Sequence, residues 1–237
     1  MTYIFPPEAV TALNVAHSAA KFAVRRVYCV GRNYAAHARE MGTDPTRDTP
    51  FFFCKPANAV LPVANGQTGD LPYPGQTANL HHEVELVVAI GKGGIDIPVE
   101  EAGHHVWGYA VGLDMTRRDL QTQMKDKGKP WEIGKAFDCS APMGELYPVS
   151  KVGFPKSAAI RLEVNGVEKQ CSNIDQMSWS VPEIISHLSR YFELNPGDLI
   201  MTGTPEGVGA VNIGDLIEAG IDGLGTLRVR VAPTIRT

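Results

Sequence analysis

Two glutamates, Glu83 and Glu85, open an apolar run that continues to Ile90. Alternate residues of a β-strand point to the same face, so a strand here places both carboxylates on one face and the apolar side chains on the other. Two such carboxylates repel each other unless a cation or a water molecule lies between them. The pattern therefore predicts either a cation site or the polar edge of a half-exposed strand.

Asp114 follows a second apolar run, Val106 to Leu113, and stands just before an expected helix. The end of a strand is a common place for a side chain that binds a ligand. Together with Glu83 and Glu85 it would form a site with oxygen ligands only, which suits a hard cation such as Mg²⁺ or Mn²⁺ better than Zn²⁺. The alternative interpretation is that Asp114 only initiates the helix.

His37 and Glu40 are three residues apart in a segment, 34–41, that is expected to be a helix capped by Asn33. Residues at this spacing are neighbours on one face of a helix, and a carboxylate beside an imidazole orients it and raises its basicity. Such a pair can deprotonate water as a general base. A surface ion pair without catalytic function has the same spacing.

Four cations stand near these acids in the sequence. Arg117 and Arg118 fall in the first turn of the helix after Asp114, where the helix dipole disfavours positive charge. Either an anion such as a substrate carboxylate lies nearby, or both side chains splay into solvent. Lys55 and Lys135 each stand alone in an apolar neighbourhood, as positioned cations or as surface lysines whose stems cover apolar side chains.

The segment 202–209, Thr-Gly-Thr-Pro-Glu-Gly-Val-Gly, follows an expected strand. Its glycines and threonines can present N–H and hydroxyl donors to an anion. It has neither the Gly-Lys-Ser/Thr ending of a P-loop nor the glycine order of a dinucleotide-binding loop. The chain also lacks a Gly-x-Ser-x-Gly elbow, which disfavours a serine hydrolase.

These residues must be positioned by a chain in which short strand signals predominate. Strands are expected over 27–30, 50–54, 83–90, 106–113, 160–164, 199–201, 216–221 and 227–231. The dipeptide Asn165-Gly166 predicts a hairpin turn. Strands outnumber helices and do not alternate regularly with them, so the predicted fold class is α+β with a large β-rich core.

Helices are expected in few places. A weak helical pattern covers Ala9 to Phe22. A capping box of Thr116 and Asp119 predicts a helix that ends near Gly128, and a better box begins at Ser180.

The composition excludes several classes of function. The 237 residues carry a formal net charge of −4 and are 43% hydrophobic, enough for a sizeable core and without a general attraction to nucleic acid or an anionic membrane. No apolar run approaches the roughly 20 residues that span a bilayer, and no signal-peptide pattern is present. The four scattered cysteines do not resemble a disulfide framework. We expect a cytoplasmic enzyme that binds neither nucleic acid nor membrane.

Five ordered motifs, at 31–37 (GRNYAAH), 81–86 (HHEVEL), 112–121 (GLDMTRRDLQ), 135–138 (KAFD) and 202–209 (TGTPEGVG), can be compared with known families. Together they resemble the fumarylacetoacetate hydrolase family, and within it the short acylpyruvate hydrolases, especially the bacterial fumarylpyruvate hydrolases. The resemblance implies a mixed β-roll or β-sandwich core with a few short helices, usually in a homodimer. Residues 1–25 would then be a short N-terminal arm and 26–237 a single catalytic domain.

The resemblance also implies a role for each candidate residue. The implied residues are Glu83, Glu85 and Asp114 for the metal, Mg²⁺ or alternatively Mn²⁺; His37, Glu40 and Lys135 for catalysis; and Arg118, Gln121 and Thr204 for substrate binding. The positions after Lys55 have no clear counterpart in the family pattern.

The implied activity is metal-dependent hydrolysis of the C–C bond of 2,4-diketo acids (acylpyruvates), chiefly of fumarylpyruvate to fumarate and pyruvate in gentisate catabolism. Water deprotonated by His37 would attack the distal carbonyl, and Gln121 and Lys135 would stabilise the oxyanion, while the dication acts as template and Lewis acid. Alternatives within the family are an oxaloacetate decarboxylase and a dienoate isomerase or decarboxylase. A non-catalytic ligand-binding homologue is the alternative of another class.

Overall fold

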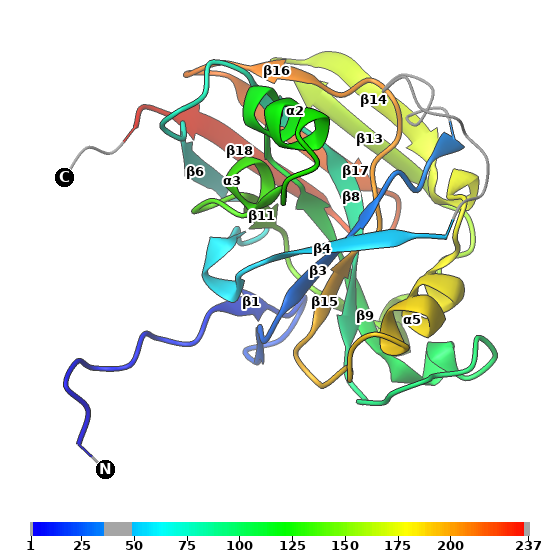
Figure 1. The fold of residues 1–237 in the computed structure, drawn as a ribbon. Coiled ribbons are helices and arrows are strands. Elements are labelled where there is room, and N and C mark those ends of the chain that lie inside the picture. The colour runs from blue at the N-terminus through cyan, green and yellow to red at the C-terminus, as the bar shows by residue number, and fades with distance from the viewer. Residues whose placement is uncertain (1, 36–48, 235–237) are drawn as a thin grey trace.

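The structure, a computed structural model, describes residues 2–35 and 49–234. In these ranges the chain folds mostly into strands, with a few short helices (Figure 1). The α-helices are α2 (Arg118–Asp126), α3 (Glu132–Lys135), α4 (Val149–Val152) and α5 (Val181–Ser189), and the 3-10 helices are η1 (Ala57–Ala59), η2 (Ala102–His105) and η3 (Ile174–Gln176). This confirms the predicted α+β fold with a β-rich, curled core.

The largest sheet of the described residues has eight strands, in the order β4-β3-β15-β8-β9-β11-β5, with β12 paired to β9. Its strands are β3 (Val27–Gly31), β4 (Phe51–Lys55), β5 (Val60–Pro62), β8 (Val84–Ile90), β9 (Val106–Leu113), β11 (Ala141–Met143), β12 (Tyr147–Pro148) and β15 (Leu199–Met201). The central strands β8 and β9 are antiparallel, with Val84 opposite Leu113. The start of β8 therefore lies beside the end of β9, which brings Glu83 and Glu85 next to Asp114.

A second sheet has the strand order β14-β13-β17-β18-β6. Its strands are β6 (Thr68–Pro72), β13 (Ala159–Val164), β14 (Val167–Asn173), β17 (Leu216–Ile221) and β18 (Thr226–Ala232). The predicted hairpin is confirmed, because β13 and β14 pair on either side of Asn165 and Gly166. Both turn residues have positive φ, 53° and 75°, as a type I′ turn requires.

Strand β8 is buried on both faces because it lies between two apolar clusters. The even-numbered residues from Val84 to Ile90 belong to the larger cluster, which also contains the inward-facing residues of β13, β17 and β18. Val87 and Ala89 belong to a second cluster with residues of β3, β11 and β15. The face that carries Glu85 thus continues into apolar core.

A small three-stranded sheet with the order β10-β7-β16 completes the frame of the site. It is formed by β7 (Leu80–His82), β10 (Thr116–Arg117) and β16 (Gly209–Val211). The motif before Glu83, the segment after Asp114 and the end of the 202–209 loop are thereby held side by side.

The two predicted capping boxes have different outcomes. The box of Ser180 and Glu183 is confirmed at the start of α5, where the Ser180 N–H donates to the Glu183 carboxylate at 2.9 Å. The box of Thr116 and Asp119 is wrong, because Thr116 lies in β10 and the helix begins only at Arg118. Asp119 instead accepts a hydrogen bond from the hydroxyl of Thr77 at 2.6 Å.

The weak helix expected over Ala9 to Phe22 is also wrong. The segment forms a hairpin of β1 (Ala12–Asn14) and β2 (Lys21–Ala23), preceded by a stretch that extends away from the sheets (Figure 1). The tertiary reason is Leu13, which is fully buried in the second apolar cluster. The helix expected over 34–41 lies almost wholly outside the described residues. Among the residues described, no helix is both long and apolar enough to cross a membrane.

Candidate active site

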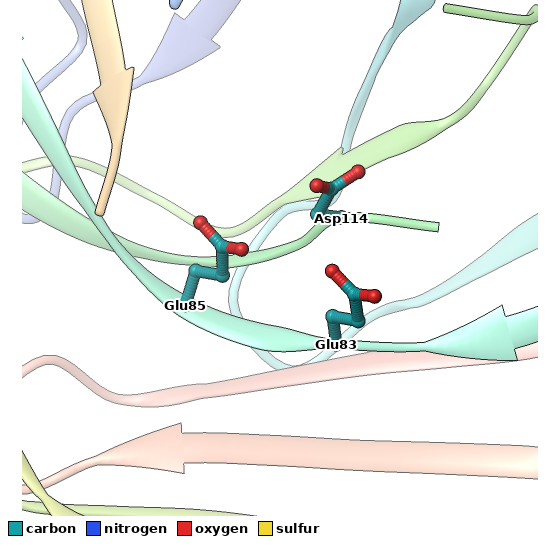
Figure 2. Close-up of side chains that lie close together, drawn as sticks. All are labelled: Glu83, Glu85 and Asp114. Atoms are coloured by element: carbon teal, nitrogen blue, oxygen red, sulfur yellow. The ribbon is translucent and has the colours of Figure 1, made fainter. Parts of the chain in front are cut away.

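Glu83, Glu85 and Asp114 form one buried group, here called the acid cluster. One carboxylate oxygen from each lies within 4.8 Å of the others, and the residues are 4%, 2% and 1% exposed. Figure 2 shows Glu83, just before β8, and Glu85, within it, on the same side of the chain and close to the segment that carries Asp114. The two alternatives are therefore wrong: Glu83 and Glu85 are not a half-exposed edge, and Asp114 does not begin the helix.

Glu85 is the member of the acid cluster that has no ion pair within the described residues. Burial, together with the nearby carboxylates of Asp114 and Glu83, raises the pKa of Glu85 well above its usual value. Oε2 of Glu85 accepts a hydrogen bond from the backbone N–H of Gly203 at 2.8 Å. A dication beside Glu85 would compensate this charge, and an all-carboxylate donor set suits a hard divalent metal. The residues present fit such an ion.

Lys135 lies against the other side of the acid cluster. Its ammonium donates to Glu83 Oε2 at 2.8 Å, to Asp114 Oδ2 at 2.7 Å and to the hydroxyl of Thr116 at 2.7 Å. Burial lowers the pKa of Lys135, but the carboxylates of Asp114 and Glu83 outweigh it and leave that pKa raised. Lys135 is thus a positioned cation and not a surface lysine.

Lys55 is also a positioned cation. Its ammonium lies 2.8 Å from Asp114 Oδ1 and donates to the backbone carbonyls of Met115, at 3.3 Å, and of Lys135. Oδ1 of Asp114 receives no hydrogen bond of regular geometry within the described residues, so its contact with Lys55 is an ion pair.

The adjacent arginines point in different directions. Arg118 is buried, donates to Glu83, and places another guanidinium nitrogen 2.5 Å from Oε1 of Gln121. Arg117 turns away, with its guanidinium 4.5 Å from the centre of the Phe137 ring and a hydrogen bond to the carbonyl of Ile133 at 3.1 Å. Only Arg118 therefore reaches the acid cluster, and neither arginine splays fully into solvent.

A cavity of about 210 Å³ opens above the acid cluster. Every predicted site residue within the described ranges lines it: Glu83, Glu85, Asp114, Arg118, Gln121, Lys135 and Thr204. His37 and Glu40, predicted as the water-activating pair, lie outside the described residues. A pocket that combines three carboxylates suited to a divalent metal with two cations and an amide can bind and polarise a small carboxylate substrate.

Comparison with known proteins identifies the family of the chain. The family described as fumarylacetoacetate (FAA) hydrolase C-terminal matches residues 26–232. The chain belongs to the fumarylacetoacetate hydrolase family. As the family and its relatives indicate, it is an enzyme that hydrolyses carbon–carbon bonds.

Three relatives of this hydrolase are informative. A crystal structure of fumarylpyruvate hydrolase from Pseudomonas aeruginosa, in complex with Mn²⁺ and pyruvate, is 65% identical, covers 98% of this chain and all of that chain, and superimposes with a TM-score of 0.97. A fumarylpyruvate hydrolase of a Ralstonia species is 46% identical over 80% of this chain and 96% of that protein. A mitochondrial oxaloacetate tautomerase of Rattus norvegicus is 43% identical over 87% of this chain and 91% of its own length.

The roles of two residues that hold the 202–209 loop were not predicted from the sequence. Gln170, on β14, is buried and donates to the hydroxyl of Thr204 at 2.8 Å. Asn33, expected only to cap a helix, is buried and donates to the carbonyls of Thr202 and Trp179 at 2.8 and 2.9 Å. Both fix the 202–209 loop from elements distant in sequence, so only the folded chain reveals their role.

Proposed function

We propose that this hydrolase cleaves the C–C bond of 2,4-diketo acids, with fumarylpyruvate as its main substrate and fumarate and pyruvate as products. The observation that carries the proposal is the acid cluster at the base of a cavity that also holds Lys135, Arg118 and Gln121. The relative from Pseudomonas aeruginosa, described in complex with Mn²⁺ and pyruvate, supports it. The proposed setting is gentisate catabolism.

The acid cluster would hold the ion, Mg²⁺ or Mn²⁺. When bound, that ion supplies electron withdrawal at the keto acid end of the substrate. Lys135 contributes a fixed positive charge beside two of the three carboxylates, which orients them. Thr204, at the cavity wall, would donate to the substrate carboxylate.

His37, oriented by Glu40, would take a proton from water, and the water oxygen would form a bond to the distal carbonyl carbon. Gln121 would donate to the oxygen on which negative charge develops, and the positive charge of Lys135 would stabilise that oxygen electrostatically. The bond between C3 and C4 then breaks. The acyl group leaves as a carboxylic acid, and the pyruvate fragment leaves as its enolate and takes up a proton.

A direct assay tests the proposal. Fumarylpyruvate and acetylpyruvate should lose their diketo absorbance when the protein and Mg²⁺ or Mn²⁺ are added. Glu83→Gln should remove the activity while the protein stays folded, since it deletes a charged ligand. Unchanged turnover by Glu83→Gln would contradict the ligand assignment, and no turnover of any acylpyruvate by the wild type would contradict the function.

The second candidate is an oxaloacetate reaction, which the 43% identical tautomerase of Rattus norvegicus favours. Tautomerisation or decarboxylation of oxaloacetate uses the same keto acid end but needs no attacking water. His37→Ala therefore separates the two candidates: hydrolysis of fumarylpyruvate should collapse, whereas a reaction of oxaloacetate should persist. Dienoate isomerase activity is tested with the same panel of substrates.

The proposal also includes a homodimer in the cytoplasm, with the family resemblance as its support. Size-exclusion chromatography with light scattering distinguishes a dimer of about twice 25.6 kDa from the monomer.

A further inference from the structure

Two cations that line the cavity are not used by the acid cluster. Arg32 and Lys125 both contribute to the cavity wall and are exposed. The other cations of that wall, Arg118 and Lys135, form ion pairs with the acid cluster. Within the described part of the chain, neither Arg32 nor Lys125 forms an ion pair. Their charge is therefore available to an anion in the cavity.

Both cations stand where the cavity meets a second, outer hollow of about 530 Å³. The residues shared by the two hollows are Arg32, Phe51, Phe53, Lys125 and Trp131, whereas the acid cluster lines only the inner cavity. The two cations thus mark the outer end of the substrate space. A molecule anchored at the acid cluster reaches them only if it extends outward.

An aromatic wall lies between these two ends. The rings of Phe51 and Trp131 are edge to face with centroids 5.2 Å apart, and those of Phe53 and Trp131 are 6.0 Å apart. The Lys135 ammonium lies 5.3 Å from the centre of the Phe53 ring, so this wall begins at the acid cluster. Aromatic faces of this kind suit a flat, unsaturated chain.

The backbone of Arg32 is held in an uncommon conformation beside the cavity. Its φ is 58°, a left-handed conformation that residues other than glycine rarely adopt. The ring of Phe51 fills the space beside Gly31, where an added Cβ would lie 1.9 Å from the ring, and the Arg32 guanidinium lies 5.6 Å from the centre of the same ring. Strain of this kind persists at binding sites when the surroundings hold it in place.

We infer that Arg32 and Lys125 bind the distal carboxylate of a dicarboxylic 2-oxo acid whose keto acid end lies at the acid cluster. This rests on the proposed function and selects acylpyruvates with an acidic acyl group over those with an apolar one. Two acids also lie here: Asp126 lines the inner cavity, and Glu132 lines the outer hollow. Lys129, which lines the outer hollow, adds a third cation to Arg32 and Lys125. Among the residues that the structure describes, the junction therefore has a net positive charge.

Equilibrium binding tests the inference without relying on hydrolysis. In the presence of Mn²⁺, the probes are 2-oxopimelate and 2-oxoheptanoate, which share the keto acid end and differ only in the distal carboxylate. We expect the wild type to bind 2-oxopimelate about tenfold or more tightly, the size of one charge-assisted hydrogen bond. Lys125→Gln and Arg32→Gln should each lower the affinity for 2-oxopimelate by that factor and leave the affinity for 2-oxoheptanoate unchanged.

Lys127→Gln is the matched control, because Lys127 is an exposed lysine just beyond the same helix that lines neither hollow. Equal affinity of the wild type for the two probes would overturn the inference, as would an effect of Lys127→Gln equal to that of Lys125→Gln. If Arg32→Gln does not fold, the affinities of Lys125→Gln for the two probes test the inference alone. Discrimination between the probes by a protein that cleaves no acylpyruvate would keep the subsite and reject the proposed function. Cleavage of fumarylpyruvate by a protein that binds the two probes equally would keep the proposed function and reject the subsite.

Discussion

The carboxylate of Asp114 is held between two buried lysines: Lys55 lies 2.8 Å from Oδ1, and Lys135 donates to Oδ2 at 2.7 Å. Lys55 comes from β4 and Lys135 from the end of α3, so the two lysines join separate parts of the fold at one side chain. Lys55 also donates to the carbonyl of Lys135, which fixes the residue that carries the second ammonium. Outer contacts of this kind orient a metal ligand.

Lys55→Met should therefore weaken the metal site without altering any ligand. Methionine keeps an unbranched apolar stem but lacks the terminal ammonium, which leaves Asp114 without its ion-pair partner at Oδ1. We expect affinity for Mn²⁺ to fall about 10–100-fold. Breaking a buried pair also costs stability, on the order of 3–5 kcal/mol. Isothermal titration with Mn²⁺ and thermal unfolding measure the two effects.

Two further variants make this test specific. Lys127→Met changes an exposed lysine and should alter neither quantity. Lys55→Arg keeps the charge and should retain part of the Mn²⁺ affinity if Lys55→Met does not fold. Wild-type Mn²⁺ affinity in folded Lys55→Met would show that Lys55 does not position Asp114.

Removal of divalent metal should abolish turnover and lower the thermal stability. A ligand at 100 times its dissociation constant stabilises the folded state by about 2.7 kcal/mol, which corresponds to roughly 5–10 °C for a chain of this size. We expect a shift of this size when Mn²⁺ is added to chelator-treated protein in a thermal-shift assay. Glu83→Gln should lose most of the shift, and an equal shift in that variant would place the ion elsewhere.

Much of this site could be predicted because its residues belong to regular elements. Glu83 and Glu85 precede and begin a strand with an unbroken apolar pattern, and period-two alternation alone puts both on one face. Asp114 follows an equally clear strand. The contact between them depends on the pairing of β8 with β9, which the sequence supports through resemblance and not through spacing.

The remaining features depend on tertiary contacts that no local pattern records. The hairpin that contains Leu13 replaces a weak helix because burial of Leu13 in the second apolar cluster outweighs helix propensity. Thr116 looked like a helix cap, but the chain pairs there with β7 and the hydroxyl accepts from Lys135. Arg117 and Arg118 are indistinguishable by spacing alone; the resemblance selects Arg118, and the fold separates them by packing Arg117 against Phe137.

Glu85 should make the stability of the metal-free protein depend on pH. Its folded pKa is raised well above the usual 4.5 by burial and by the neighbouring carboxylates. Well below pH 4.5 the side chain is protonated in both the folded and the unfolded state. As pH rises, the unfolded state releases its proton first, so the folded state loses stability until the pH reaches the folded pKa of Glu85. Glu85→Gln cannot titrate, and should become increasingly more stable than the wild type over this range.

Bound metal should reverse the order of stability of the wild type and Glu85→Gln. With saturating Mn²⁺ at neutral pH, the wild type should gain stability and Glu85→Gln should gain little, since the variant lacks a charged ligand. Thermal unfolding at several pH values, with chelator and with Mn²⁺, measures both halves. A constant difference in stability between the two metal-free proteins from pH 4.5 upward would mean that folding does not raise the pKa of Glu85.

Gln170 connects the acid cluster to the loop that carries Thr204, and its replacement should affect substrate binding. Its Oε1 accepts the N–H of Val84 at 3.1 Å, and its Nε2 donates to the Thr204 hydroxyl and to the carbonyl of Pro205 at 2.8 and 2.9 Å. Gln170→Leu leaves these buried groups unsatisfied, at a cost of about 1–3 kcal/mol for each. Because Thr204 then loses its orientation, KM for fumarylpyruvate should rise more than kcat falls. Gln176→Leu, an exposed site, is the control, and an unchanged KM in Gln170→Leu would mean that Thr204 is held by other contacts.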